Sequence, residues 1–320
     1  MRRPCIVDCD PGHDDAVAIM LAAASTELDL RAITTVAGNG TLDKVTYNAR
    51  RVCTLAGIRD VPIAAGADRP LVRLLETAPH VHGESALDGP ALPEPDVPLD
   101  PRPADRVIAD VAAEAATAGE PVTLVAIGPL TNVATALDRH PELAGTLGEI
   151  VVMGGSTGRG NHAPYAEFNI YVDPEAAARV FASGVPVTMV GLNVTHQALA
   201  TSDVVARLLA LDTDLARVVA GWMTYFGSSY EDLWGLAGPP VHDACAVAMA
   251  IDPTIVRHEE AFVAIETEGR WTRGATVVDL HRRLGQPPNV RVAMDLDAER
   301  FWDLAIGAVR RLGERAAART

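Results

Sequence analysis

The chain has 320 residues, of which 48% are apolar, so it can bury one large α/β core or two smaller ones. Its formal net charge of −15 excludes nucleic acid and anionic lipid as expected partners, because both carry dense negative charge. Charges or prolines interrupt every apolar stretch before the roughly 18 residues that a membrane-spanning helix requires, so we expect no membrane association.

Strands and helices alternate along the first part of the predicted secondary structure. Short runs rich in Val and Ile predict strands at residues 4–9, 29–37, 121–127, 149–153 and 185–190. Helical patterns are predicted at residues 14–24, 42–57 and 130–138. Nearly continuous apolar strands indicate parallel pairing with both faces covered. The expected fold class is therefore α/β, with an open, mainly parallel, Rossmann-like sheet flanked by helices.

The later segments depart from this alternation. Seven prolines between residues 79 and 103 predict a long irregular loop, which in a compact domain is usually functional or disordered. Residues 203–251 have a helical pattern, and we expect them to form an insertion or cap. Residues 255–295 predict short strands in hairpins, a small antiparallel part near the C-terminus, and residues 299–317 predict an amphipathic helix. Because no internal repeat divides the sequence, we expect residues 1–320 to form a single domain.

The N-terminus and the cysteines bear on cellular location. The first apolar run begins at Cys5, stops at Asp8 and is too short for a signal peptide. The four cysteines lack the spacing of a zinc site. We therefore expect reduced thiols and a cytoplasmic protein.

The motif with the clearest chemistry follows the first predicted strand and reads DCDPGHDD over residues 8–15. It places four carboxylates within eight residues at a strand end, and strand ends form the ligand crevice of an open parallel sheet. The alternative interpretation is a helix cap, but a cap needs only one acid. Four acids in a small volume repel one another unless protons or a cation neutralise them. Oxygen ligands without a neighbouring Cys or His pair favour a hard ion, Ca²⁺ or Mg²⁺.

Three further segments carry polar groups at the ends of predicted elements. Asp243, in the sequence VHDA, precedes an apolar helix and is either a functional acid or an N-cap. The segment IGPLTN at residues 127–132 is either an ordinary turn or the source of a main-chain carbonyl that faces the crevice. The third segment is either a polar loop or a sugar-binding site, and it contains Met153 with the two glycines after it, Asn161, and EFN at residues 167–169.

Together these segments resemble the inosine-uridine-preferring nucleoside hydrolase family, in which DCDPGHDD, GPLTN, MGG, EFN and VHD occur in the same order and spacing. The resemblance extends from residue 5 to beyond residue 300. It implies an open α/β fold with Ca²⁺ at the base of a deep pocket. It further implies hydrolysis of the N-glycosidic bond of ribonucleosides to free base and ribose, by a homodimer or homotetramer.

The resemblance also implies a role for individual residues. The ion would be held by Asp10, Asp15, Asp243 and the main-chain oxygen of Ile127, where family members often have Thr. The ribose 2′- and 3′-hydroxyl groups would be held by Asp14, Asn39 and Asn169, and the 5′-hydroxyl by Asn161 and Glu167, with Met153 beside the substrate.

The reaction requires an activated water and a neutralised leaving base. Asp10 is the expected base, because one carboxylate oxygen can face an ion-bound water while the other contacts the ion. His242 is the candidate that protonates or hydrogen-bonds to the leaving base. The base pocket is expected to include His82 from the irregular loop and Tyr230 from the helical cap, with Tyr225 and Trp234 near it and Phe226 packed in the core.

Two other functions fit part of the sequence. Asp8 and Asp10 would form the D-x-D motif of a haloacid dehalogenase-type phosphatase, with Asp8 as nucleophile. That interpretation leaves the other acids unexplained and expects Thr or Val where Gly12 stands. The second alternative is a non-catalytic nucleoside-binding protein on the same fold, which no residue excludes.

Overall fold

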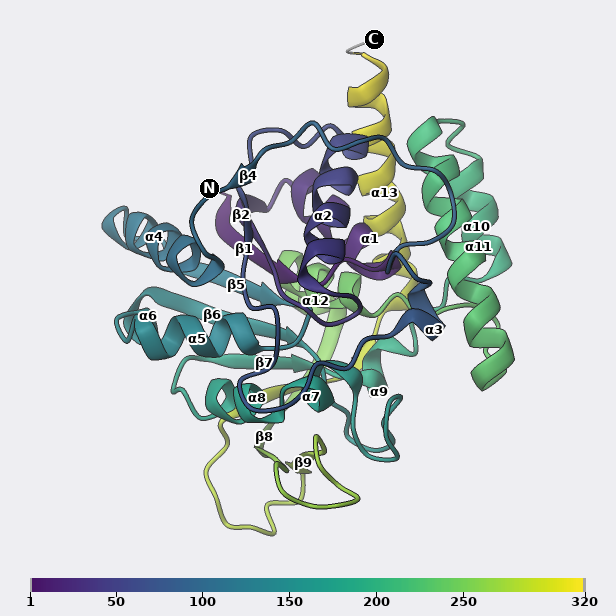
Figure 1. Ribbon diagram of the computed structural model, residues 1–320. Helices are drawn as coiled ribbons and strands as arrows, with labels where there is room; N and C mark the ends of the chain where they lie inside the picture. Colours follow the sequence, from purple (N-terminus) through teal and green to yellow (C-terminus); the bar gives the residue numbers. More distant parts are fainter. Residues whose placement is uncertain (1, 319–320) are drawn as a thin grey trace.

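A computed structural model describes residues 2–318, apart from the side chains of residues 229–234. Within this part of the chain, ten strands form one sheet in the order β4-β3-β2-β1-β5-β6-β7-β10-β8-β9 (Figure 1). The strands are Arg3–Cys9 (β1), Leu28–Thr35 (β2), Ile63–Ala65 (β3), Leu99–Asp100 (β4), Val122–Ala126 (β5), Leu147–Met153 (β6), Val187–Val190 (β7), Val256–Ile265 (β8), Thr276–Asp279 (β9) and Val290–Leu296 (β10).

The pairing confirms the predicted fold class. All pairs from β4 to β7 are parallel, and β10 also pairs in parallel with β7. The pairs β10–β8 and β8–β9 are antiparallel, and they form the small antiparallel part that was expected near the C-terminus. After β1 the chain builds the sheet outward through β2, and after β4 it returns to the other side of β1 with β5. The strand order therefore reverses between β1 and β5, where open α/β sheets bind ligands.

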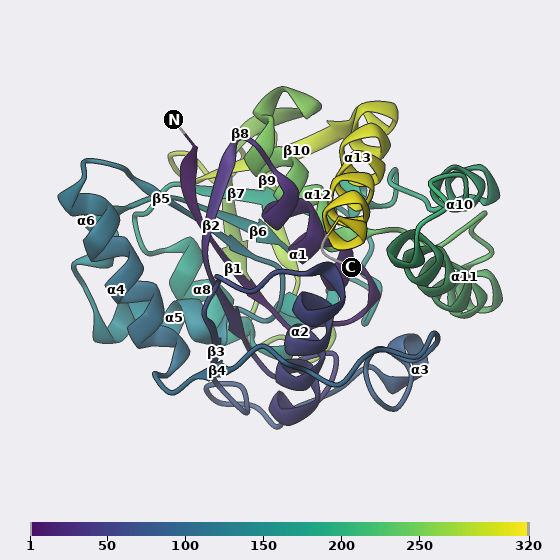
Figure 2. The same cartoon turned by 90° about the horizontal axis from the view of Figure 1, so that it is seen from above.

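Helices cover both faces of the sheet, as Figure 2 shows from above. One face carries α1, α2, α12 and α13, and the other carries α4, α5 and α8. The helices are His13–Ala24 (α1), Leu42–Ala56 (α2), Pro79–His82 (α3), Ala104–Thr117 (α4), Thr131–Arg139 (α5), Leu143–Thr146 (α6), Phe168–Val172 (α7), Pro174–Phe181 (α8), Leu192–Thr195 (α9), Ser202–Leu209 (α10), Asp214–Trp234 (α11), His242–Ile251 (α12) and Ala298–Ala317 (α13), with a 3-10 turn at Pro253–Ile255.

The alternation of side chains along β1 divides the hydrophobic core into two layers. Cys5, Val7 and Cys9 face α1 and α12, whereas Ile6 faces the layer of α4, α5 and α8. Helix α12 is buried along its whole length, because it lies between the sheet, α1 and α13. This burial fixes the first residue of α12 close to the ends of the central strands.

The helical segment at residues 203–251 has two parts. Helices α10 and α11 lie side by side outside α13, and α3 contacts α11, as Figures 1 and 2 both show. Helix α12, in contrast, belongs to the core. Within the described residues, no helix is both long and apolar enough to span a bilayer.

Candidate active site

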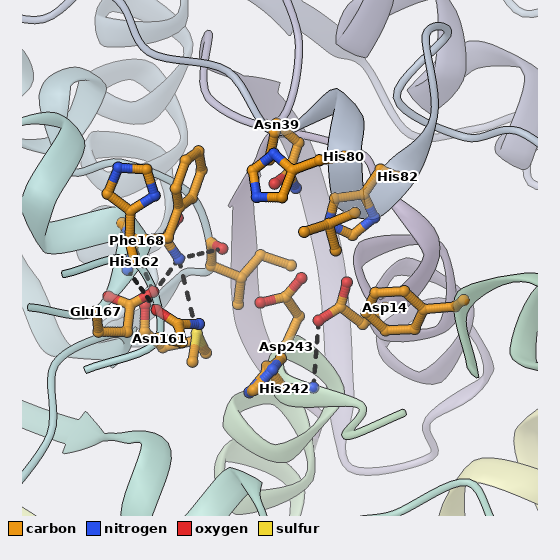
Figure 3. A pocket seen from close by; sticks show the side chains of 16 residues that line it. Asp14, Asn39, His80, His82, Asn161, His162, Glu167, Phe168, His242 and Asp243 are labelled. Carbon is orange, nitrogen blue, oxygen red and sulfur yellow. Dashed lines mark hydrogen bonds between the residues drawn. The ribbon is translucent and has the colours of Figure 1, made fainter. Parts of the chain in front are cut away.

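A pocket with about 570 Å³ of empty space opens at the carboxyl ends of the central strands (Figure 3). It is lined by Asp14, Asn39, Ala78, His80, Val81, His82, Ile127, Met153, Asn161, His162, Glu167, Phe168, Asn169, Phe226, His242 and Asp243. Most residues that the sequence nominated for the site therefore face one cavity. Asp10 and Asp15 are fully buried next to it.

Acidic side chains from two helix starts and one strand end form the floor of the pocket. Asp14 and Asp15 lie in the first turn of α1, and Asp243 lies in the first turn of α12. One carboxylate oxygen from each of these three residues lies within 4.8 Å of the others. Asp10 joins the cluster, because its backbone N–H donates to Oδ1 of Asp15 at 3.1 Å. In Figure 3, Asp14 and Asp243 extend into the same part of the cavity.

Burial governs the electrostatics of this floor. Burial, followed by the charges of neighbouring acids, raises the pKa of Asp10 and of Asp243 well above the usual range and that of Asp14 to about 8. Oδ1 of Asp10 is buried and has no hydrogen-bond partner within the described part of the chain. A divalent cation would neutralise the cluster and satisfy that oxygen, so the donor set fits a hard metal ion.

Main-chain and amide groups orient the Asp10 carboxylate. Its Oδ2 accepts the backbone N–H of Asn39 at 2.7 Å. The Asn39 amide donates to the main-chain oxygen of Asp10 at 3.1 Å and to Oδ2 of Asp15 at 3.3 Å. Glycines allow this approach, because a Cβ would lie 2.2 Å from the carboxylate at Gly38 and 2.7 Å from it at Gly128. Asp10 is thus fixed with one oxygen held by the protein and the other available.

The opposite wall, shown on the left of Figure 3, carries amide and carboxylate groups. The Asn169 amide donates to the main-chain oxygen of Ile127 at 2.9 Å and to that of Met153 at 3.2 Å. A carbonyl oxygen has two lone pairs, so Ile127 retains one acceptor site for an ion. Glu167 accepts the backbone N–H groups of Asn169 at 2.8 Å and Gly155 at 3.0 Å. Burial raises the pKa of Glu167 to about 7.

Asn161 stands beside Glu167 on this wall. Its Oδ1 accepts the backbone N–H of Phe168 at 3.0 Å, which fixes the orientation of the amide and leaves its N–H₂ group able to donate. His162, the next residue, also lines the pocket, and its Nε2 lies 3.3 Å from Oε2 of Glu76. This wall therefore offers both donors and an acceptor to a polyhydroxyl ligand.

Imidazole rings form the remaining side of the pocket. His242 is buried, and its Nδ1 lies 2.7 Å from the hydroxyl of Thr195. Burial lowers the pKa of His242 well below its usual value, so the ring is neutral near pH 7. His82 stacks on Phe226 with ring centroids 5.1 Å apart. Phe226 is buried, as expected for a core residue, but it also lines the pocket.

Two expected residues cannot be placed in the site, and three residues of the site were not expected from the sequence. The side chains of Tyr230 and Trp234 lie outside the described residues. The sequence did not single out Thr195, His80 or His162. Thr195 ends the short helix α9 directly after β7, so the strand-end rule that found Asp10 could have indicated it.

The phosphatase interpretation conflicts with the position of Asp8. This residue is fully buried, and its carboxylate accepts hydrogen bonds from the Thr34 hydroxyl and from the Asn132 amide at 2.8 Å. It does not line the pocket. These bonds tie Asp8 to β2 and α5, whereas Asp10 is hydrogen-bonded to Asp15 in the acid cluster at the floor of the pocket.

Comparison with known proteins gives a consistent result. Residues 5–303 match the family model described as inosine-uridine preferring nucleoside hydrolase. The pyrimidine-specific ribonucleoside hydrolases RihA of Citrobacter koseri and of Escherichia coli K12 are each 48% identical over 305 residues, which cover 95% of this chain and 97% of theirs. The solved purine-preferring ribonucleoside hydrolase from Gardnerella vaginalis is 31% identical with a TM-score of 0.91, covering 98% of this chain and 100% of that one. A plant nucleoside hydrolase, PpNRh1, is 30% identical with a TM-score of 0.88, covering 97% and 99%.

Proposed function

Because the chain belongs to the inosine-uridine preferring nucleoside hydrolase family and hydrolyses the N-glycosidic bond of ribonucleosides, we propose that it acts on pyrimidine ribonucleosides with Ca²⁺ as its metal ion. One observation carries the proposal for the metal: several buried acids adjoin the pocket, and Oδ1 of Asp10 has no partner among the described residues. The acids and the carbonyl are oxygen donors, which Ca²⁺ prefers.

We assign the ion to Asp10, Asp15, Asp243 and the main-chain oxygen of Ile127. When bound, the ion supplies a positive charge that lowers the pKa of a water and orients it. Oδ1 of Asp10, which has no hydrogen-bond partner among the described residues, would contact the ion with one lone pair and accept a proton from the attacking water with the other, because Asn39 occupies Oδ2.

The ribose lies across the floor in this proposal. Asp14 and Asn169 bind the 2′- and 3′-hydroxyl groups with Asn39, and Asn161 and Glu167 bind the 5′-hydroxyl on the opposite wall. Water attacks C1′, the bond from C1′ to the base nitrogen breaks, and its electron pair leaves with the base. The surrounding carboxylates stabilise the positive charge that develops on the ribosyl ring.

The leaving base lies among His82, His242 and Phe226. His242 is neutral, so we propose that it hydrogen-bonds to the base rather than acting as a preformed imidazolium. Thr195 holds the ring of His242 in place through Nδ1. Tyr230 remains a proposed contact of the base.

The proposed preference for pyrimidines rests on the relatives named as pyrimidine-specific, which share 48% identity with this chain, against 31% for the purine-preferring structure. A release assay that detects free base from uridine, cytidine, inosine, adenosine and guanosine tests it. We expect the highest kcat/KM for uridine or cytidine, and a higher value for any purine nucleoside would refute the preference. Tight binding of every nucleoside in calorimetry without release of base would favour the non-catalytic alternative.

Cellular location and assembly remain proposals. The four buried cysteines form no disulfide, which supports a cytoplasmic location. We propose a homodimer or homotetramer from the resemblance to the family, since single exposed apolar side chains such as Trp271 and Leu74 are ordinary on a protein surface. Light scattering after size-exclusion chromatography measures the assembly directly.

A further inference from the structure

His13 lies directly behind the base end of the pocket, although it does not line the cavity. It is fully buried and stacks on His82, with ring centroids 5.3 Å apart, and on Phe226 at 5.2 Å. The reaction described above gives His13 no role. Its hydrogen bonds nevertheless reach His82, which faces the proposed base.

The proton of His13 can be placed from its partners. Its Nε2 lies 2.8 Å from the main-chain oxygen of Asp88, and a carbonyl oxygen can only accept. Nε2 therefore carries the hydrogen. The ring is fully buried and stacked between His82 and Phe226, a setting that disfavours a charged imidazole, so with its one hydrogen on Nε2 it holds a lone pair on Nδ1.

The proton of His82 follows from that of His13. The two Nδ1 atoms lie 3.0 Å apart, and the lone pair on His13 requires a hydrogen on Nδ1 of His82. The backbone N–H of His13 also approaches Nδ1 of His82, at 3.4 Å, and this contact alone would favour a lone pair on that nitrogen. It is longer and weaker than the two ring contacts of His13, to His82 at 3.0 Å and to Asp88 at 2.8 Å, which together require the hydrogen there. A neutral imidazole has one N–H, so Nε2 of His82 is an acceptor.

The ring of His82 is also held in place. The backbone N–H of Asp88 donates to the main-chain oxygen of His82 at 3.0 Å, which closes a circuit of three hydrogen bonds through Asp88, His13 and His82. Gly12 permits this packing, because a Cβ there would lie 2.6 Å from Nδ1 of His82.

We propose that His13 is a positioning residue that fixes His82 as its Nδ1–H tautomer, so that Nε2 of His82 accepts a hydrogen bond from an N–H on the edge of the nucleobase. The inference rests on the proposed function, in which His82 contacts the base. It favours bases that present an N–H at this edge, such as N3–H of uracil, over bases alkylated there.

The tautomer can be measured without turnover. In the full-length protein labelled with ¹⁵N-histidine, long-range ¹H–¹⁵N correlation spectra distinguish a protonated ring nitrogen from one with a lone pair, and a His82→Gln spectrum assigns the signals. We expect Nδ1–H and an unprotonated Nε2 for His82 in the wild type. We expect His13→Phe, which keeps a flat ring but has no acceptor, to populate the other tautomer of His82. His13→Asn, whose amide oxygen can replace Nδ1, should restore the wild-type pattern, and His140→Phe at the end of α5 should not change it.

A kinetic comparison tests the consequence for the substrate. Methylation of uridine at N3 should lower kcat/KM of the wild type roughly tenfold, the equivalent of one hydrogen bond. His13→Phe should lower kcat/KM for uridine by a similar factor and respond little to methylation. An Nε2–H tautomer of His82 in the wild type would overturn the proposal, as would equal methylation effects in the two proteins. If His13→Phe does not fold, the wild-type spectrum decides: Nδ1–H with an unprotonated Nε2 on His82 supports the proposal, and Nε2–H overturns it. Because the spectra need no substrate, they separate failure of this inference from failure of the proposed function.

Discussion

The substitution Asp10→Asn tests the centre of the mechanism with the smallest change in shape. Asn39 donates its backbone N–H to Oδ2 of Asp10 at 2.7 Å, so the new amide must present its oxygen to Asn39. Its N–H₂ group then takes the position of Oδ1, which has no hydrogen-bond partner among the described residues. An amide nitrogen at this position neither accepts a proton nor binds a cation.

The size of the effect follows from what is lost. Removal of a general base alone costs about 10²- to 10⁴-fold in rate, and loss of a metal ligand adds to this. We therefore expect kcat to fall by at least about three orders of magnitude. Stability should not fall with it, because burial and then the charges of neighbouring acids raise the pKa of Asp10, and a neutral side chain avoids both the burial of a charge and the repulsion.

The assay combines turnover, binding and unfolding. Uridine hydrolysis gives kcat, calorimetry gives the affinity for Ca²⁺, and thermal unfolding without Ca²⁺ gives the stability. Asp138→Asn is the matched control, because Asp138 forms an exposed ion pair with Arg179 away from the pocket. Activity of Asp10→Asn within tenfold of the wild type would refute the role of Asp10, and a clear loss of stability without Ca²⁺ would refute the repulsion argument.

Three further predictions concern the ion, the pocket wall and the packing of Gly66 against Asn132. Chelation should lower Tm more at about pH 8 than at about pH 5.5. The pKa of Asp14 is raised to about 8, so bound protons stabilise the metal-free protein at low pH, and this stabilisation is lost as pH rises. Scanning fluorimetry with EDTA should show the difference, and equal losses of Tm at the two pH values would contradict it. Glu167→Gln should lower the free energy of unfolding in urea by ~1–3 kcal/mol, because Glu167 accepts three buried backbone N–H groups, and an unchanged midpoint would count against the role of those bonds. Gly66→Ala should cost ~1–3 kcal/mol, because its Cβ would lie 2.1 Å from Oδ1 of Asn132; chemical denaturation measures the change, and wild-type stability would show that Asn132 moves freely.

The fold could be predicted from the sequence where hydrophobic patterns were long and uniform. Strands β1, β2, β5, β6 and β7 were recognisable because buried parallel strands are almost continuously apolar. Strands β3 and β4 were missed, because they have only three and two residues and lie at the edge of the sheet. Helix α4 was also missed, since its alanine-rich sequence follows the proline-rich loop and gave no separate signal.

The candidate site could be predicted as far as strand and helix ends define it. Asp14 and Asp243 were found because acids at helix starts are conspicuous in a sequence, and the structure brings both to one floor. The strand-end position could have indicated Thr195, but the roles of Thr195 and His13 could not be assigned, because they depend on which ring nitrogen each meets in three dimensions. The orientation of Phe226 was equally inaccessible, since one aromatic ring both fills the core and borders the cavity.

The residues proposed to hold the ion and part of the proposed base pocket lie on different elements of the fold. The acids proposed to hold the ion follow β1 or begin α1 and α12, and the complete burial of α12 leaves little room for change there. Two of the groups near the proposed base, His82 and Phe226, come from α3 and α11, which lie outside the helices that cover the sheet, whereas His242 begins α12. Substitutions in α3 and α11 can therefore change the base pocket while the residues proposed to hold the ion stay the same. One fold can in this way change its nucleobase specificity and keep the machinery that cleaves the N-glycosidic bond.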